Sequence, residues 1–336
     1  MHMIHAAAWR LSAAFALAIG MALASVVAVA AEVEVVRVNL FPTAKQLPFL
    51  LGNERGIFAK RGIKLDLQYT ENSTTQRADL ASGKVDVVHS AVDNAVAMVE
   101  MAGNDVVIVM GGDSGSNEFI VQPHLKGFAD VKGRILVVDA TNTAFALQAK
   151  KILLGYGLKE GVDYQIKAIG RGAQRLQAMV DDKNNAAAIM NPPFSVQAVQ
   201  MGMKSLGRTV DLLGPYQSAG VFVMRKWGRE HGPLLERYLA SYVESLRAVF
   251  DPANRADCER LLRAQLKLSA EEAAETYKLL LDPKIGYVRD AKLDPEGFKA
   301  TLALRAEIEN KGAAVPPPEK YLDLSYYQRA IESLGR

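Results

Sequence analysis

Short apolar segments alternate with amphipathic segments along most of the chain, a pattern typical of α/β proteins. Ile135–Val138 is a continuous apolar run, which indicates a strand buried on both faces, and residues 144–153 carry apolar side chains at helical spacing. Thr141, Asn142 and Thr143 separate the two segments. Because a helix N-terminus leaves backbone N–H groups unpaired, these polar side chains either cap the helix or help to hold a ligand.

The order strand, polar loop, helix and strand occurs twice in the sequence. Residues 35–67 and 133–166 both contain it, and residues 80–103 resemble residues 179–202 in the same way. Identity within each pair is low, so chance similarity between βα units is the alternative. Strands that alternate with helices through two halves predict an α/β fold with two lobes, each with a mostly parallel sheet.

Two further apolar runs mark the places where the chain passes from one half to the other. Glu118–Gln122 and Gly220–Arg225 are expected to be crossover strands, which makes the first lobe discontinuous. We predict that lobe 1 contains residues 31–120 and 222–336, including a helical C-terminal region, and that lobe 2 contains residues 121–221.

The first thirty residues have the composition of an export signal. Arg10 is their only charged residue, and an Ala, Leu and Val-rich stretch leads to Ala28-Val29-Ala30. Small residues at these positions are typical of a cleavage site, so we predict a cleaved signal peptide at residues 1–30 and a periplasmic mature protein. An uncleaved membrane anchor is the alternative.

Composition excludes several classes of function. The chain has a net charge of +3 and no strongly basic run, so we expect no nucleic-acid partner. Cys258 is the only cysteine, which excludes a disulfide within the chain. The sequence has neither His and Cys residues at metal-site spacing nor a phosphate-binding loop or nucleophile elbow. We therefore expect no catalytic residue, no metal and no cofactor. The predicted oligomeric state is a monomer.

Five segments, taken in order, resemble those of a known family: residues 52–67 (GNERGIFAKRGIKLDL), 80–87 (LASGKVDV), 128–138 (FADVKGRILVV), 155–164 (GYGLKEGVDY) and 190–194 (MNPPF). The chain resembles the solute-binding proteins of bacterial ABC importers, in the nitrate/taurine/alkanesulfonate branch that also includes thiamine-precursor binders. The resemblance implies a type II periplasmic-binding-protein fold, with two α/β lobes and a ligand cleft between them. It also implies a small-molecule solute and an ABC permease in the inner membrane as partners.

Two other functions are compatible with the resemblance. The yeast thiamine-pyrimidine synthase shares the implied fold and consumes its own His and a bound cofactor, but its Cys-rich motif has no counterpart here. A periplasmic sensor that passes its signal to a receptor is the third alternative. Neighbouring genes for a permease and an ATPase would distinguish an importer component from a sensor.

Ligands of open α/β sheets bind beyond the carboxyl ends of the strands, where polar loops follow the predicted strands of this chain. Thr43 and Thr143 occupy corresponding junctions, as hydroxyl donors to a ligand or as helix caps. Arg171 is the candidate cation for a carboxylate or sulfonate, and an exposed loop arginine is the alternative. Asp93 would attract a cationic or donor group, and otherwise caps its helix. The candidate ligand-binding residues are Phe41, Thr43, Gln46, Ser73, Thr74, Ser90, Asp93, Asn94, Asn142, Thr143, Arg171, Asn191 and Pro192.

Aromatic side chains and hydroxyls fit an organic acid or sulfonate, and a neutral heterocycle is the alternative. His89 lies in an apolar segment and is expected to be an interior residue rather than a metal ligand. Residues 111–115 are interpreted as the loop that enters the hinge. The candidates for apolar walls of the cleft, each explained equally well by core packing, are Phe41, Phe194, Tyr216 and Phe222.

Overall fold

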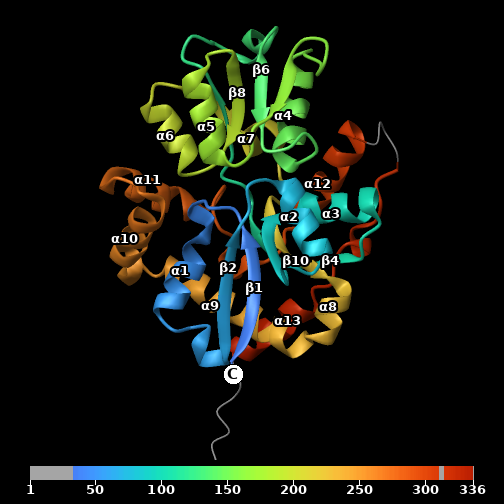
Figure 1. Cartoon of the computed structure of the whole chain (residues 1–336), viewed down its shortest axis with the longest axis vertical. Helices are drawn as coiled ribbons and strands as arrows, with labels where there is room; N and C mark the ends of the chain where they lie inside the picture. Colours follow the sequence, from blue (N-terminus) through green and yellow to red (C-terminus); the bar gives the residue numbers. More distant parts are fainter. Residues whose placement is uncertain (1–32, 310–313, 336) are drawn as a thin grey trace, which may run out of the picture. The chain divides into compact units, whose positions relative to one another are not determined.

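The strands of the protein form two five-stranded mixed sheets, described by a computed structural model over residues 33–309 and 314–335 (Figure 1). The predicted signal peptide, residues 1–30, lies outside the described residues. In spatial order, the first sheet contains β2 (Ile63–Tyr69), β1 (Glu34–Leu40), β3 (Val87–Ala91), β10 (Ala219–Met224) and β4 (Val106–Asp113). The second contains β7 (Gln165–Ala168), β6 (Ile135–Val138), β8 (Asn185–Met190), β5 (Glu118–Val121) and β9 (Lys204–Arg208).

Each sheet contains four strands that run in one direction and one strand that runs the opposite way. The opposite strand is the first one formed after the chain crosses from the other sheet. In the first sheet β1 is parallel to β2 and β3, and β10 is antiparallel to both β3 and β4. In the second sheet β6 is parallel to β7 and β8, and β5 is antiparallel to both β8 and β9. The carboxyl ends of β1, β2, β3 and β4 therefore share one edge, as do those of β6, β7 and β8.

The strands read as apolar runs because both faces of each sheet are buried. In β4 and β10 of the first sheet, Val107 and Val221 belong to one apolar cluster, whereas Ile108 and Phe222 belong to another on the opposite face. The same alternation divides β8 of the second sheet. Successive side chains point to opposite faces of a strand, so helices must cover both sides of such a sheet.

Helices from several parts of the chain cover the first sheet. Long helix α9 packs with α1 against one face, and α2 and α3 pack against the other. Thr43 and Ser269 show why some helical segments begin where they do: Thr43 Oγ1 accepts from the N–H of Lys45, and Ser269 forms a capping box with Glu272. The helices outside the second sheet are α1 (Leu47–Glu54), α2 (Ser73–Ala81), α3 (Val92–Ala102), α8 (Arg225–Glu230), α9 (Gly232–Phe250), α10 (Arg255–Leu266), α11 (Ala270–Leu280), α12 (Pro295–Ile308) and α13 (Ser325–Leu334).

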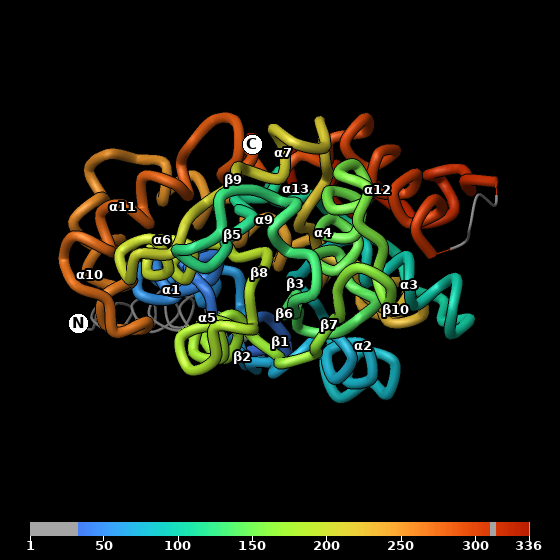
Figure 2. Tube along the Cα trace, turned by 90° about the horizontal axis from the view of Figure 1, so that it is seen from above, coloured from blue at the N-terminus to red at the C-terminus, as the bar shows by residue number. Residues whose placement is uncertain are grey.

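The second sheet has its own helices, and α12 lies beside one of them. α4 packs on one face of the sheet, and α5 and α6 pack on the other. Figure 2 shows that α12, from the C-terminal region, runs next to both α3 and α4, which belong to different sheets. The helices of this part are α4 (Ala144–Gly155), α5 (Gly172–Asp181), α6 (Phe194–Gln200) and α7 (Thr209–Leu213).

The predicted boundaries between lobes stay a prediction. β5 of the second sheet begins at Glu118, and β10 of the first sheet begins at Ala219, close to the predicted crossovers. Residues 111–113, interpreted from the sequence as a hinge loop, continue strand β4 instead, because Asp113 still pairs with Ala219 of β10.

Among the described helices, none is both long enough and apolar enough to cross a bilayer.

Candidate functional site

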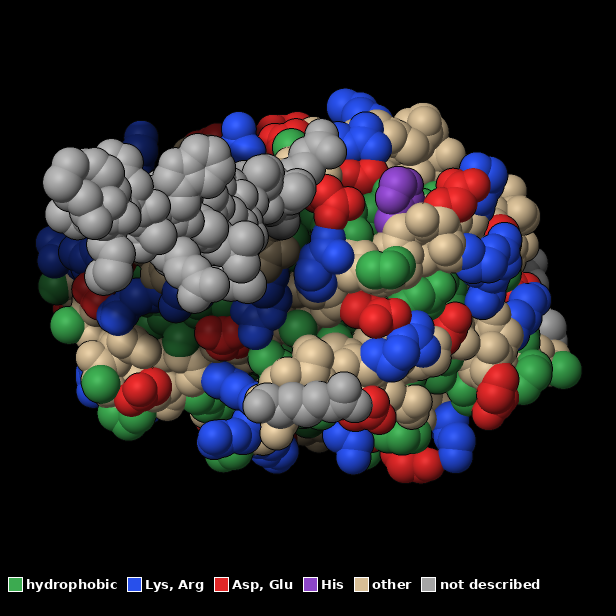
Figure 3. Space-filling model, turned by 90° about the horizontal axis from the view of Figure 1, so that it is seen from below, with side chains coloured by type: hydrophobic (Ala, Val, Ile, Leu, Met, Phe, Trp, Pro, Cys, Tyr) green, Lys and Arg blue, Asp and Glu red, His purple; other side chains and the backbone are tan. Residues whose placement is uncertain are grey.

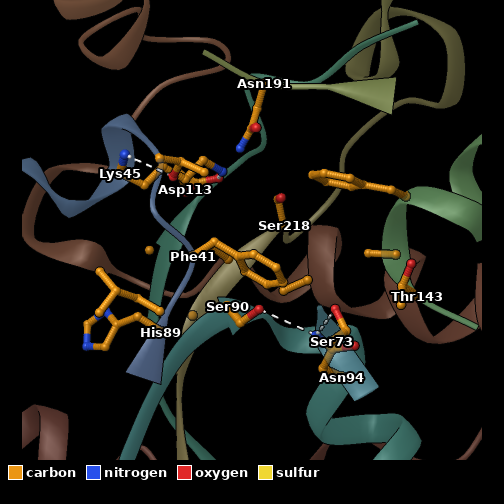
Figure 4. A pocket seen from close by; sticks show the side chains of 18 of the residues that line it. Phe41, Lys45, Ser73, His89, Ser90, Asn94, Asp113, Thr143, Asn191 and Ser218 are labelled. Atoms are coloured by element: carbon orange, nitrogen blue, oxygen red, sulfur yellow. Dashed lines mark hydrogen bonds and ion pairs between the residues drawn. The ribbon is translucent and has the colours of Figure 1, made fainter. Parts of the chain in front are cut away.

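A pocket lies between the two sheets, where loops that follow strands of both sheets come together. Its volume is about 110 Å³, somewhat below the roughly 150 Å³ of a cavity that holds benzene. In Figure 4, Phe41 and Ser218 lie near the middle of the pocket, and Ser73, Ser90 and Asn94 are grouped at one side. The residues of the second-sheet part that line it are Asp139, Thr143, Ala144, Phe145, Gly172, Arg175 and Asn191.

The structure brings seven of the thirteen candidate residues together around this pocket. They lie at the carboxyl ends of β1, β2, β3, β6 and β8 or in the loops and helix starts that follow, as expected if the strand ends converge. Whether they bind a solute stays a prediction. The seven residues are Phe41, Thr43, Ser73, Ser90, Asn94, Thr143 and Asn191.

The other six candidate residues are not part of the pocket lining. Gln46 is buried, and its side-chain oxygen accepts from the Tyr69 hydroxyl at 2.6 Å. Thr74 is exposed on α2, and Pro192 is buried beside the pocket residue Asn191. Arg171 forms an ion pair with Glu71 at 2.8 Å, with about a third of its side chain exposed. Neighbouring positions in one loop therefore have different environments.

Asp93 and Asn142 meet at α12 instead, in a group we call the α12 cluster: Asp93, Asn142, Arg305 and Glu309. Arg305 donates from Nε and Nη2 to the two carboxylate oxygens of Asp93, both at 2.6 Å, and from Nη1 to Asn142 Oδ1 at 2.8 Å. Asn142 Nδ2 donates to Glu309 at 3.3 Å. Burial alone would lower the pKa of Arg305, but the charge and hydrogen bonds of Asp93 outweigh burial and raise it.

A hydrogen-bonded network crosses the pocket from one sheet to the other. Asp139 follows β6 of the second sheet, and its carboxylate accepts from the Ser73 hydroxyl at 2.7 Å and from the Thr143 hydroxyl at 2.8 Å. Ser73 begins α2 of the first-sheet part, and its oxygen accepts from Asn94 Nδ2 at 3.1 Å. Because Ser73 gives its only hydroxyl proton to Asp139, it can only accept from Asn94. The nitrogen of the Asn94 amide must therefore face Ser73.

The amide oxygen of Asn94 is left without a partner by this arrangement. Asn94 is buried, and its Oδ1 has no hydrogen-bond partner among the described residues. A buried carbonyl oxygen without a donor costs free energy, on the order of 1–3 kcal/mol. The side chain lines the pocket, although Oδ1 itself has almost no exposed surface.

A second pair of charged residues lines the pocket on the first-sheet side. Lys45 Nζ contacts Asp113 Oδ1 at 2.8 Å, and the same carboxylate oxygen accepts from the N–H of Gly115 at 2.9 Å. Gly111, Gly112 and Gly220 make the adjoining wall of bare backbone. A Cβ at Gly220 would lie only 2.6 Å from Val92 and 2.7 Å from the carbonyl oxygen of Met110, so glycine is required for this close packing.

Arg175 is the cation on the second-sheet side of the pocket. It is buried on α5, donates to the carbonyl oxygen of Gly170 at 2.6 Å, and lies over the ring of Phe145. Burial lowers the pKa of Arg175, and the charge of Asp139 opposes this shift. Its Nε is buried and has no partner among the described residues.

His89 belongs to the apolar side of the pocket and is neutral. Its Nε2 lies 2.7 Å from the hydroxyl of Tyr238, and its ring packs against Phe49 and Tyr242. Burial lowers the pKa of His89 to about 3, so the ring carries no charge near neutral pH. Of the four predicted aromatic wall residues, Phe41 lines the pocket, whereas Phe222 lies in the core of the first sheet.

Sequence reasoning missed four charged residues of the pocket. Asp139 directly follows the buried run Ile135–Val138, and Asp113 follows Gly111-Gly112, so their positions at strand ends were the available signal. Lys45 lies inside the loop that supplied Thr43. Arg175 is one helical turn after Arg171, and no local sequence feature distinguishes the two arginines.

The described residues contain no group of three or more His, Cys, Asp or Glu side chains arranged to hold a metal ion. Cys258 is buried on α10, away from the pocket lining, and burial raises the pKa of its thiol to about 12. Such a thiol has little thiolate at neutral pH and is a poor nucleophile.

The sequence as a whole matches a described protein family. The model of the NMT1-like family matches residues 29–263, which is more than half of the chain. The chain belongs to the NMT1-like family. A search of curated proteins gave no significant match to this NMT1-like chain.

Solved structures share the fold of this NMT1-like protein at low sequence identity. The periplasmic nitrate-binding protein NrtA from Synechocystis PCC 6803 is 14% identical with a TM-score of 0.75, covering 90% of this chain and 89% of NrtA. The alkanesulfonate-binding protein SsuA from Xanthomonas axonopodis pv. citri, bound to MOPS, is 16% identical with a TM-score of 0.68, covering 86% of this chain and 96% of SsuA.

A third neighbour is the ligand-binding component of an ABC-type import system from Staphylococcus aureus. It is 13% identical with a TM-score of 0.72, covering 88% of this chain and 99% of that one. Likeness at this identity shows the fold alone. The prediction of a periplasmic-binding-protein fold is confirmed, and the neighbours of this fold include the nitrate- and alkanesulfonate-binding proteins that the sequence resembles.

Proposed function

We propose that the chain is the solute-binding component of an ABC importer, which captures a small solute in the pocket and delivers it to a membrane permease. The observation that carries this proposal is the pocket itself, because its lining comes from loops of both sheets. A solute that contacts both halves stabilises the closed arrangement more than an open one, so binding is converted into a change of shape. A permease can recognise such a change.

The periplasm is the proposed location, and the protein is proposed to be a binding protein rather than an enzyme. Its neighbours of similar fold are named as nitrate-binding, alkanesulfonate-binding and ABC import components. On the described part of the face drawn in Figure 3, basic and acidic side chains are interspersed, which gives no support for a nucleic-acid surface. N-terminal sequencing of the exported protein would test the predicted cleavage after residue 30.

Release of a bound solute is the direct test of solute capture. The exported protein, purified from a periplasmic fraction, is equilibrated with a small-molecule extract, separated from unbound compounds and denatured, and the released compounds are identified by mass spectrometry. We expect one compound or a few related compounds to be enriched. The sequence predicts that this compound is an organic acid or a sulfonate.

Two variants provide the controls for this experiment. Ser218→Leu fills the centre of the pocket and is expected to abolish enrichment, because Ser218 is a buried lining residue. Thr74→Ala changes an exposed residue outside the lining and is expected to have no effect. Enrichment that survives in a folded Ser218→Leu variant, or no enrichment by the wild type, would contradict the proposal.

Delivery to a permease is tested separately from capture. Uptake of the released compound is measured in cells that lack this protein or the permease encoded beside it. Loss of uptake in both strains is expected for an importer component. Normal uptake without the protein, together with loss of a transcriptional response to the compound, would favour the sensor alternative.

A further inference from the structure

The charged residues of the pocket lining balance one another. Among the described lining residues, Lys45 and Arg175 are cations and Asp113 and Asp139 are anions, while His89 is neutral. The formal charge of the lining is therefore zero, from two positive and two negative groups. A pocket without net charge does not favour a bound anion over a neutral molecule by long-range attraction.

Three of the four charged groups are also already engaged with ionic or hydroxyl partners. Lys45 is bound to Asp113, and Asp139 accepts hydrogen bonds from Ser73 and Thr143. The guanidinium of Arg175 donates to the carbonyl oxygen of Gly170. A carboxylate or sulfonate beside Lys45 would have to displace Asp113, and one beside Arg175 would be repelled by the nearby Asp139.

Neutral polar groups and apolar surface make up the rest of the lining. The hydroxyls of Thr43, Ser90 and Ser218 and the amide of Asn191 belong to it. Hydroxyl and amide groups can both donate to and accept from a neutral ligand. The rings of Phe41 and Phe145, with the backbone of Gly111, Gly112 and Gly220, offer contact to an apolar body.

We infer that the pocket selects a small uncharged organic molecule with a hydrogen-bond donor and acceptor over anions such as nitrate and sulfonates. This inference rests on the proposed function and narrows it. It separates the chain from neighbours of the same fold that are named for binding nitrate and alkanesulfonate. The physical basis is that Asp113 and Asp139 balance the charges of Lys45 and Arg175 in the lining.

Three probes of similar size and different charge test the inference. Benzamide is uncharged, benzoate is an anion and benzylammonium is a cation, and each is titrated calorimetrically into the exported protein near neutral pH. We expect benzamide to bind at least about tenfold more tightly than either ion, and nitrate not to compete with it. Equal or tighter binding of benzoate or benzylammonium, or binding of none of the three, would overturn the inference.

Charge-changing variants provide the second arm of the test. Asp139→Asn keeps the size of the side chain and gives the lining a net positive charge, so benzoate is expected to gain about tenfold relative to benzamide. Asn94→Asp gives a net negative charge and is expected to shift the preference toward benzylammonium. Asp113→Asn replaces Asp139→Asn if the latter does not fold, and Thr74→Ala is the matched control. An unchanged order of the three probes in the folded charge variants would also contradict the inference.

The inference and the proposed function fail in different ways. If the extract experiment releases an anion and benzoate binds more tightly than benzamide, solute capture stands and the charge preference is wrong. If the extract releases nothing and none of the probes binds, both are wrong.

Discussion

The pocket and the α12 cluster are both places where polar residues of the two sheets meet, yet their side chains are used differently. In the α12 cluster, each guanidinium nitrogen of Arg305 donates to Asp93 or Asn142. No residue of the cluster lines the pocket. In the pocket, by contrast, polar and charged side chains surround an open space of about 110 Å³. The difference teaches that polar residues packed against one another form a structural contact, whereas polar residues around a cavity leave room for a ligand.

The largest expected effect is in the α12 cluster. Arg305→Met removes the partner of Asp93, whose carboxylate is then buried without a cation, and the free energy of unfolding should fall by about 3–5 kcal/mol. Urea denaturation measures this change. The double variant Arg305→Met/Asp93→Asn should recover part of the loss, because no buried charge remains. A loss below about 1 kcal/mol would show that the pair behaves like an exposed one.

The second effect concerns the neutral histidine beside the pocket. Because the pKa of His89 is about 3 in the folded protein and 6.5 when unperturbed, only the unfolded state binds its proton between these values. Stability from His89 is therefore complete above the unfolded pKa and is lost as the pH falls toward the folded value. From about pH 7 to about pH 5 the loss should be about 2 kcal/mol.

His89→Gln tests this pH dependence. The variant removes the titrating group, so its free energy of unfolding should fall by about 2 kcal/mol less than that of the wild type over the same pH range. Urea unfolding at both pH values measures the difference. The pH slope is compared rather than the absolute stability, because the substitution also changes packing. Parallel curves for the two proteins would mean that the folded state binds the His89 proton as readily as the unfolded state, so the pKa is not lowered.

A smaller effect is expected at the network that crosses the pocket. Ser73→Ala removes the hydroxyl that binds Asp139 and fixes the Asn94 amide, so benzamide affinity should fall about tenfold in calorimetric titration. Thr74→Ala, at the next position, should leave the affinity unchanged because Thr74 is exposed. Equal effects of the two substitutions would remove Ser73 from the site.

The smallest effect is expected at Arg171. Its ion pair with Glu71 is partly exposed, so Arg171→Met should change the free energy of unfolding by less than about 1 kcal/mol and leave benzamide binding unchanged. Thermal unfolding and titration of the same preparation measure both quantities. A large loss of affinity would return Arg171 to the set of ligand-binding residues.

Periodicity predicted the elements of the fold because buried strands and amphipathic helices have different spacings of apolar residues. Residues 135–138 form β6 and residues 144–155 form α4, as the apolar pattern indicates. Glu118–Val121 and Ala219–Met224 are the strands at the passages between the sheets. The repeated βα order, together with the segments that resemble the solute-binding family, was enough to predict the fold.

Local sequence did not determine which side chain of a loop faces the pocket. Thr43 and Thr143 occupy corresponding junctions, yet Thr43 caps a helical turn and Thr143 donates to Asp139. Arg171 and Arg175 lie one helical turn apart, and only Arg175 lines the pocket. The packing of α5 decides between the two arginines, since it buries one and leaves the other at the surface.

The sequence by itself determined the two sheets, the loops at their strand ends and the family of the chain, because these depend on local spacing and on the order of segments. Only the tertiary structure decided which charges cancel. Asp139 binds Ser73, which is 66 positions away in the sequence, and Arg305 binds Asp93, which is 212 positions away. Electrostatic balance depends on distances in space, which a linear pattern does not contain.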